Sequence, residues 1–194
     1  HYESDKIHVE GLIVAEETDP SHWASTMSLH EWLKAEGIPG MSCVDTRFLV
    51  KTLRTEGVMM GVLKVFPQQE NCGVEELQEI LAKTSRYDNL NLVERISPKN
   101  IIVHQPHRES KKLVAIIDCG VKYGILRELL SRGYNVVRFP YNCPVDEILS
   151  LKPCGVVVSN GPGNPAILRD VIETVKALVE YEVPLLGICL GHQV

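Results

Sequence analysis

The stretch Val183-Pro184-Leu185-Leu186-Gly187-Ile188-Cys189-Leu190-Gly191 decides the fold of this chain. A short apolar run leads into a Gly-x-Cys-x-Gly pattern and helix-compatible residues follow, which predicts a strand, a sharp turn and a helix. The two glycines allow the tight turn and keep side chains away from the cysteine between them. We therefore predict that Cys189 is a nucleophile at a helix N-terminus, where the positive helix end favours the thiolate. The alternative is a buried structural cysteine at a strand end.

The chain around this elbow alternates apolar segments with amphipathic ones. Strands are predicted at residues 113–118, 135–139, 155–159 and 185–188, with helices at 125–130, 146–151 and 167–178. Nearly continuous apolar strands in this order predict an α/β domain with a mainly parallel, doubly wound sheet. Sites in such sheets lie at the carboxyl ends of the strands. We therefore expect Cys189 and the loop 160–165 to share one edge of the sheet.

The loop Asn160-Gly161-Pro162-Gly163-Asn164-Pro165 follows the third of these strands. It can be a plain turn, or it can hold a backbone N–H toward the nucleophile on the next strand. An oxyanion hole needs two convergent donors, because a single hydrogen bond leaves much of the developing charge unpaired. In that interpretation the loop completes a hole with the backbone N–H of Leu190.

Other polar residues near the elbow have less specific patterns. His192 lies three residues beyond Cys189 on the same helix, and we predict a structural role because a partner base normally comes from elsewhere in the fold. Gln193, at i+4 from the cysteine, either faces the pocket and binds a polar substrate or lies on the surface. The strand end Asp118-Cys119-Gly120 is either a pocket edge or a structural turn.

The first half of the chain has a different pattern. We predict a strand at 7–16, a helix with a capping box at Ser28, a helix from Asp45 to Gly57, a strand at 58–66 and a helix at 74–81. Residues 97–112 contain two prolines and little periodicity, so they are read as a linker with one short strand at 101–103. The predicted domains are 1–96, a linker at 97–112, and 113–194.

Composition excludes several classes of function. The net charge is −5 and no segment concentrates lysine and arginine, so a nucleic-acid partner is not expected. No apolar run is long enough to cross a membrane. Six cysteines without metal-ligand spacing predict no metal site and reduced thiols in the cytoplasm, with most of the other five cysteines buried. The polar start without methionine predicts a piece of a longer protein.

The elbow residues 187–193 resemble the nucleophile motif of class I glutamine amidotransferases, and residues 159–165 are similar to their oxyanion loop, which commonly has Asp at the position of Asn164. In the first half, four segments resemble the N-terminal domain of the carbamoyl phosphate synthetase small subunit: 20–23, 29–33, 37–40 and 44–47. Residues 118–123 and 125–127 also resemble that family. The likeness extends over essentially the whole chain.

The resemblance implies a subunit that hydrolyses glutamine and sends ammonia through a tunnel to a large synthetase subunit, which makes carbamoyl phosphate for arginine or pyrimidine synthesis. ATP and Mg belong to that partner, and no cofactor is implied in this chain. The site residues follow by position: Cys189 as the nucleophile, the N–H groups of Leu190 and Gly163 as oxyanion donors, and Gly161, Gly163, Leu190 and Gln193 as contacts of L-glutamine.

The family also has a catalytic His and an acidic residue well beyond the nucleophile, and a glutamine-holding serine before the region of residues 1–5. Neither segment is in this sequence, so we expect an internal fragment that is inactive alone. Three alternatives stay open: the glutaminase of another amidotransferase, a non-catalytic scaffold, and an unrelated cysteine hydrolase on the same fold.

Overall fold

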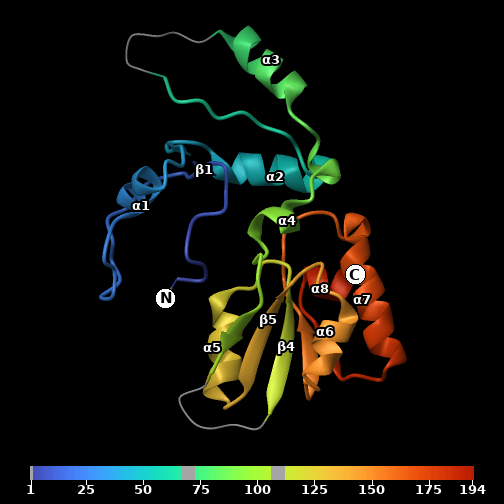
Figure 1. Cartoon of the computed structure of the whole chain (residues 1–194). Helices are drawn as coiled ribbons and strands as arrows, with labels where there is room; N and C mark the ends of the chain where they lie inside the picture. Colours follow the sequence, from blue (N-terminus) through green and yellow to red (C-terminus); the bar gives the residue numbers. More distant parts are fainter. Residues whose placement is uncertain (1, 67–72, 106–111) are drawn as a thin grey trace. The chain divides into compact units, whose positions relative to one another are not determined.

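A computed structural model describes residues 2–66, 73–105 and 112–194. The chain forms two compact units (Figure 1). One unit contains residues 88–194 and the N-terminal residues up to Ser4, and the other contains Asp5–Tyr87. The candidate site lies in the first unit.

The first unit is built on a five-stranded sheet with the strand order β3-β5-β4-β6-β7. Four neighbouring strands are parallel, and β3 is an antiparallel edge strand paired with β5. The strands are β3 (Ile102–His104), β4 (Leu113–Asp118), β5 (Asn135–Pro140), β6 (Gly155–Val158) and β7 (Leu185–Gly187). The predicted mainly parallel sheet is therefore confirmed.

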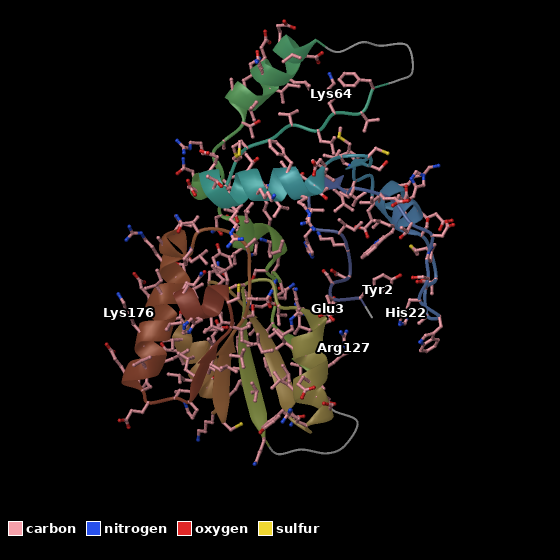
Figure 2. The ribbon with its side chains drawn as sticks, turned by 180° about the vertical axis from the view of Figure 1, so that it is seen from behind. Tyr2, Glu3, His22, Lys64, Arg127 and Lys176 are labelled. Atoms are coloured by element: carbon pink, nitrogen blue, oxygen red, sulfur yellow. The ribbon has the colours of Figure 1, made fainter. Side chains whose placement is uncertain are left out.

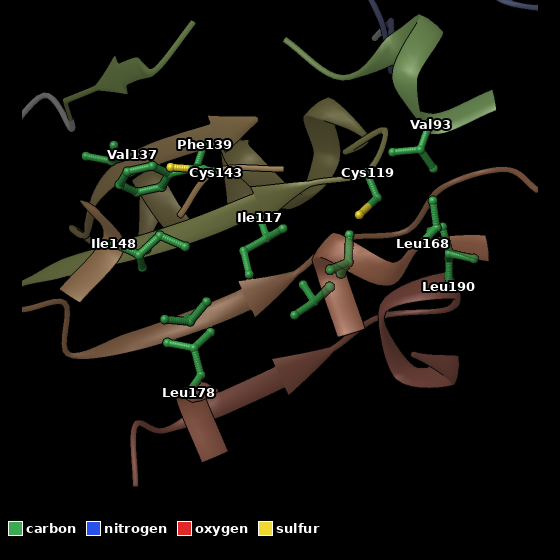
Figure 3. Close-up of a cluster of buried hydrophobic side chains, with 14 residues drawn as sticks. Val93, Ile117, Cys119, Val137, Phe139, Cys143, Ile148, Leu168, Leu178 and Leu190 are labelled. Atoms are coloured by element: carbon green, nitrogen blue, oxygen red, sulfur yellow. The ribbon is translucent and has the colours of Figure 1, made fainter. Parts of the chain in front are cut away.

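Helices cover both faces of this sheet (Figure 1). Val114 and Ile116 of β4 pack with Leu126 of α5, whereas Ala115 and Ile117 of the same strand pack with α6 and α7 on the other face. Figure 3 shows that second cluster, with Phe139, Ile148 and Leu178 fully buried. The helices of this unit are α4 (Leu92–Ile96), α5 (Tyr123–Ser131), α6 (Val145–Ser150), α7 (Arg169–Glu180) and α8 (Leu190–Gln193). A strand buried on both faces needs apolar residues at every position, which explains the continuous apolar runs of the sequence.

The sheet unit begins earlier than the domain boundary predicted from the sequence. Helix α4 precedes residue 97, yet its Val93 is completely buried in the core of the sheet unit. Strand β3 lies where the sequence predicts a linker with one short strand, and it extends the sheet. The five-residue helix α4 gives little periodicity, so its contribution to the core was not visible in the sequence.

The N-terminal residues of the chain belong to the sheet unit through contacts with α5. The Glu3 carboxylate accepts from the Gly124 N–H at 2.7 Å and forms an ion pair with Arg127. Arg127 also donates to the Tyr2 carbonyl at 3.0 Å (Figure 2). The hydrogen bond from Gly124 is the main reason that the pKa of Glu3 is lowered.

The second unit has small elements: β1 (Leu12–Ile13), paired in parallel with β2 (Gly40–Met41), and the helices α1 (Leu29–Ala35), α2 (Thr46–Glu56) and α3 (Val74–Lys83). The predicted helices are confirmed, including the Ser28 capping box and the termini of α2 at Asp45 and Gly57. A 3-10 helix follows at Tyr87–Asn89.

Two predictions of strands in the first half are wrong: one strand is much shorter than predicted, and the other does not form. The strand at 7–16 is reduced to the two residues of β1, and residues 58–66, all of them described, form no strand. Val58 and Val65 are 69% and 71% exposed, so these two apolar side chains are not buried as in a core strand. A strand is stabilised by its neighbours, which a sequence pattern alone does not supply.

No helix among the described residues is long and apolar enough to cross a membrane. Of the cysteines other than Cys189, Cys119 and Cys143 are buried as predicted, whereas Cys43 and Cys154 are exposed. Cys72 lies outside the described residues.

Candidate active site

Cys189 lies at the turn between β7 and α8 in a strained conformation. Its φ is 53° and its ψ is −111°, a left-handed region that side chains with a Cβ atom rarely adopt. Such strain costs about 1–3 kcal/mol and persists only where the surroundings impose it. The residue is exposed, which contradicts the alternative of a buried structural cysteine. The elbow therefore presents the thiol to solvent at the carboxyl end of a parallel strand.

The glycines of the elbow are required by close packing. A Cβ atom on Gly187 would lie 2.3 Å from the Gly191 carbonyl oxygen, and one on Gly191 would lie 2.1 Å from the Val158 carbonyl oxygen. Neither glycine has a positive φ, which is instead adopted by the cysteine between them. Both glycines therefore let the backbone of α8 approach β6 and β7 more closely than any side chain would permit.

The loop after β6 lies against the elbow. Ile188 donates its N–H to Val158 at 3.0 Å, and Gly191 donates to the Ser159 carbonyl at 3.2 Å. A Cβ atom on Gly161 would lie 2.7 Å from Leu190 Cδ2. The structure thus brings the loop 160–165 and the nucleophile elbow together at one edge of the sheet, as the strand order of the sequence predicts.

The two predicted oxyanion donors lie on these two segments. Leu190 is the first residue of α8, so its backbone N–H has no acceptor within that helix. Gly163 has a φ of +98°, a conformation that favours glycine. Asn164, at the position where the family commonly has Asp, accepts from the Ala166 N–H at 3.0 Å and begins the 3-10 helix η2 (Pro165–Ile167). The assignment of both donors stays a prediction.

The residues that follow the elbow are held by the cysteine backbone. His192 and Gln193 donate their N–H groups to the Cys189 carbonyl at 2.9 and 3.2 Å. Both residues are exposed. The structural role of His192 and the glutamine contact of Gln193 stay predictions.

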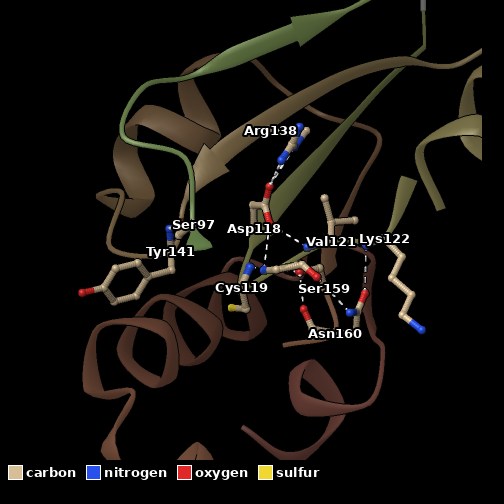
Figure 4. A network of polar contacts seen from close by, with 10 residues as sticks. Ser97, Asp118, Cys119, Val121, Lys122, Arg138, Tyr141, Ser159 and Asn160 are labelled. Atoms are coloured by element: carbon tan, nitrogen blue, oxygen red, sulfur yellow. Dashed lines mark hydrogen bonds and ion pairs between the residues drawn. The ribbon is translucent and has the colours of Figure 1, made fainter. Parts of the chain in front are cut away.

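The strand end Asp118-Cys119-Gly120 forms a turn with a buried ion pair, shown in Figure 4. One carboxylate oxygen of Asp118 accepts from the N–H groups of Gly120 and Val121, both at 2.8 Å. The other accepts from Arg138 on β5, with Nε at 2.7 Å. The structure therefore favours the structural turn over the pocket edge. Arg138 was missed in the sequence, because its only signal was a lone charge in an apolar strand.

Burial makes the thiols of Cys119 and Cys143 poor nucleophiles. It raises the pKa of Cys119 to about 12, with a smaller contribution from the negative charge of Asp118. Burial and then Glu147 raise the pKa of Cys143 to about 12. Among the described residues, no cluster of three or more His, Cys, Asp or Glu side chains could hold a metal ion.

Comparison with known families agrees with this geometry. Residues 115–194 match the class I glutamine amidotransferase family, and residues 1–63 match the CPSase domain of the carbamoyl-phosphate synthase small chain. A CPSase small-chain match and a class I glutamine amidotransferase match therefore lie on this one chain. The amidotransferase match runs from within β4 to α8 and hence contains the elbow and the loop beside it.

Small-chain relatives are similar over the whole length of this chain. The carbamoyl phosphate synthase small chain of Metallosphaera sedula is 47% identical over 194 residues, which are 100% of this chain and 50% of the relative. That of Pyrococcus furiosus is 47% identical over 100% of this chain and 51% of the relative, and that of Thermotoga maritima is 41% identical over 98% and 47%. The chain thus spans about half the length of the curated relatives it matches.

Proposed function

We propose that the intact protein carrying this chain hydrolyses glutamine through Cys189 and supplies ammonia to a large synthetase subunit that makes carbamoyl phosphate. The observation that carries this proposal is the strained, exposed Cys189 between two glycines that cannot accept a Cβ atom. A strained backbone held by close packing is typical of sites in which one side chain must be presented to a substrate. The family matches on both halves of the chain support the substrate and the partner.

The chemistry is acyl transfer through a thioester. The Cys189 thiolate attacks the side-chain amide carbon of glutamine, and the oxygen of the tetrahedral intermediate is held by the N–H groups of Leu190 and Gly163. Collapse of the intermediate breaks the C–N bond, and the leaving nitrogen takes a proton and departs as ammonia. Water then attacks the thioester carbon and glutamate leaves with the thiolate restored. In the family, the proton carrier is the histidine beyond the nucleophile, outside this sequence.

The partner and the pathway are part of the same proposal. The relatives are named as small chains, which implies a large subunit. That subunit would use bicarbonate, ATP and Mg with the ammonia, and the carbamoyl phosphate would serve arginine or pyrimidine synthesis. Gly161, Gly163, Leu190 and Gln193 would contact the glutamine, with no cofactor in this chain.

The test combines turnover with covalent labelling of the intact protein. We expect Cys189→Ala and Cys189→Ser to abolish glutaminase turnover, and an electrophilic glutamine analogue to add once, at Cys189. Cys154→Ser is the matched control, because Cys154 is also exposed but is not part of the elbow at residues 187–193. Unchanged turnover in Cys189→Ala, or an adduct on another thiol, would end the assignment.

Two other functions make different predictions in the same assay. A glutaminase of another synthase would give the adduct, but adding the large carbamoyl phosphate synthetase subunit would not yield carbamoyl phosphate. A non-catalytic scaffold would give no adduct and no ammonia. The match of residues 1–63 to the small-chain CPSase domain favours the first proposal over both.

A further inference from the structure

After Asn160 the oxyanion loop continues with Gly161, Pro162 and Gly163, and its backbone must be held by contacts from outside. Gly161 carries no side chain that could pack and fix its position, and glycine loses more conformational freedom on ordering than any other residue. An oxyanion donor works only when it is fixed before the charge develops. Gly161 lies two residues before the proposed donor Gly163, so the contacts that hold Gly161 are candidates for positioning that donor.

Those contacts come from the turn after β4. A Cβ atom on Gly161 would lie 2.2 Å from the Cys119 carbonyl oxygen, so the backbone of the loop rests directly on that turn. Asn160 donates from Nδ2 to the Gly120 carbonyl at 2.9 Å, and its Oδ1 accepts from the Lys122 N–H at 3.3 Å. The single Asn160 side chain thus bonds to both sides of the turn.

A second connection runs through the serine before it. Ser159 Oγ accepts from the Cys119 N–H at 2.9 Å and donates to the Asn160 carbonyl at 2.9 Å. Ser159 is completely buried, and its own carbonyl accepts from Gly191 of the elbow. The same residue therefore links the turn, the oxyanion loop and the nucleophile elbow.

The turn itself is fixed by the Asp118–Arg138 pair. The Asp118 side chain is 1% exposed and that of Arg138 is 13% exposed. Both oxygens of the carboxylate are occupied, one by the turn and one by Arg138 (Figure 4). A buried ion pair whose carboxylate accepts hydrogen bonds on both oxygens favours one geometry, because breaking it leaves a buried charge unpaired.

We propose that Asn160 is a positioning residue for the oxyanion loop. It ties the loop to the turn after β4, and the Asp118–Arg138 pair holds that turn in place. This inference rests on the proposed function, since it assumes that the loop donates to an oxyanion. Asn160 does not touch the reacting atoms in this role. It fixes where the backbone N–H groups of Gly161 and Gly163 point.

Asn160→Ala in the intact protein is the test, because Asn160 is only half-buried and its loss leaves no charge unpaired. We expect kcat for glutamine to fall roughly 10–100-fold with KM changed less than about threefold, since misplacement by about 1 Å has effects of that size. Alkylation of Cys189 by iodoacetamide forms no oxyanion, so its rate should be unchanged. The kcat of Asn160→Asp should fall by as much as that of Asn160→Ala, because a carboxylate cannot donate to the Gly120 carbonyl.

Ile148→Val is the matched control, because it removes a buried methylene from α6, a helix that contributes no residue to the network described above, and should lower the melting temperature. We expect it to leave kcat unchanged. The inference is overturned if Asn160→Ala lowers only the melting temperature, if Asn160→Asp restores kcat, or if alkylation and turnover fall together. A wild-type protein that alkylates at Cys189 but does not release ammonia would instead refute the proposed function, and the inference with it.

Discussion

Gly191→Ala tests whether residue 191 must be glycine because of close packing, although helix propensity would favour alanine there. Gly191 has an ordinary φ and lies within α8, where replacing glycine with alanine normally stabilises a helix by about 1 kcal/mol. The structure predicts that alanine at this position destabilises the protein instead. The new Cβ atom would lie 2.1 Å from the Val158 carbonyl oxygen and 2.9 Å from that of Ser159, and both obstacles are backbone.

The magnitude follows from the distances. An unstrained contact begins near 3.4 Å, so α8 must move away from β6 by roughly 1 Å, which also breaks the hydrogen bond from Gly191 to Ser159. Overpacking of this kind costs about 1–3 kcal/mol and the lost hydrogen bond about 1 kcal/mol. We expect the free energy of unfolding to fall by about 2–4 kcal/mol, and kcat/KM for glutamine to fall about 100-fold as Cys189 moves.

The assay is urea unfolding of the intact protein together with glutaminase kinetics. Gly133→Ala is the control, because its φ is +82° but a Cβ atom there would meet nothing within 4 Å. It should cost about 1 kcal/mol of backbone strain and leave kcat/KM unchanged. Equal or higher stability of Gly191→Ala, with normal turnover, would refute the reasoning.

Three further predictions concern other parts of the chain. Mass-mapped alkylation near neutral pH should label Cys189 but leave Cys119 and Cys143 unlabelled, because burial raises the pKa of both to about 12; rapid labelling of either would contradict their burial. Glu3→Gln should lower the urea midpoint above pH 4.5, because the lowered pKa of Glu3 stabilises the fold while the carboxylate is charged. The difference from wild type should shrink below pH 4.5 and vanish once the pH is below the lowered pKa of the folded state; a difference that persists there would exclude this cause. Ser28→Ala should cost about 1 kcal/mol through loss of the capping box, whereas Ser28→Asp should retain most of the stability, as measured by urea unfolding.

The sequence alone predicted the elements whose signals are local. The capping box at Ser28 and the helix from Asp45 to Gly57 were both predicted, because a cap is a contact between residues three or four positions apart. The strands of the parallel sheet were predicted because each is buried on both faces and therefore apolar throughout. The false strand at 58–66 had the same apolar content but no partner strand.

The sequence by itself also determined the candidate nucleophile and the edge of the sheet on which it lies, since the glycine spacing around Cys189 and the order of the strands are properties of the chain. The tertiary structure alone decided why those glycines are needed, that Asp118 pairs with Arg138, and that Asn160 bonds to the turn after β4. These contacts join residues 20 to 40 positions apart on neighbouring strands. Their partners are set by strand order and register, which exist only once the sheet has formed.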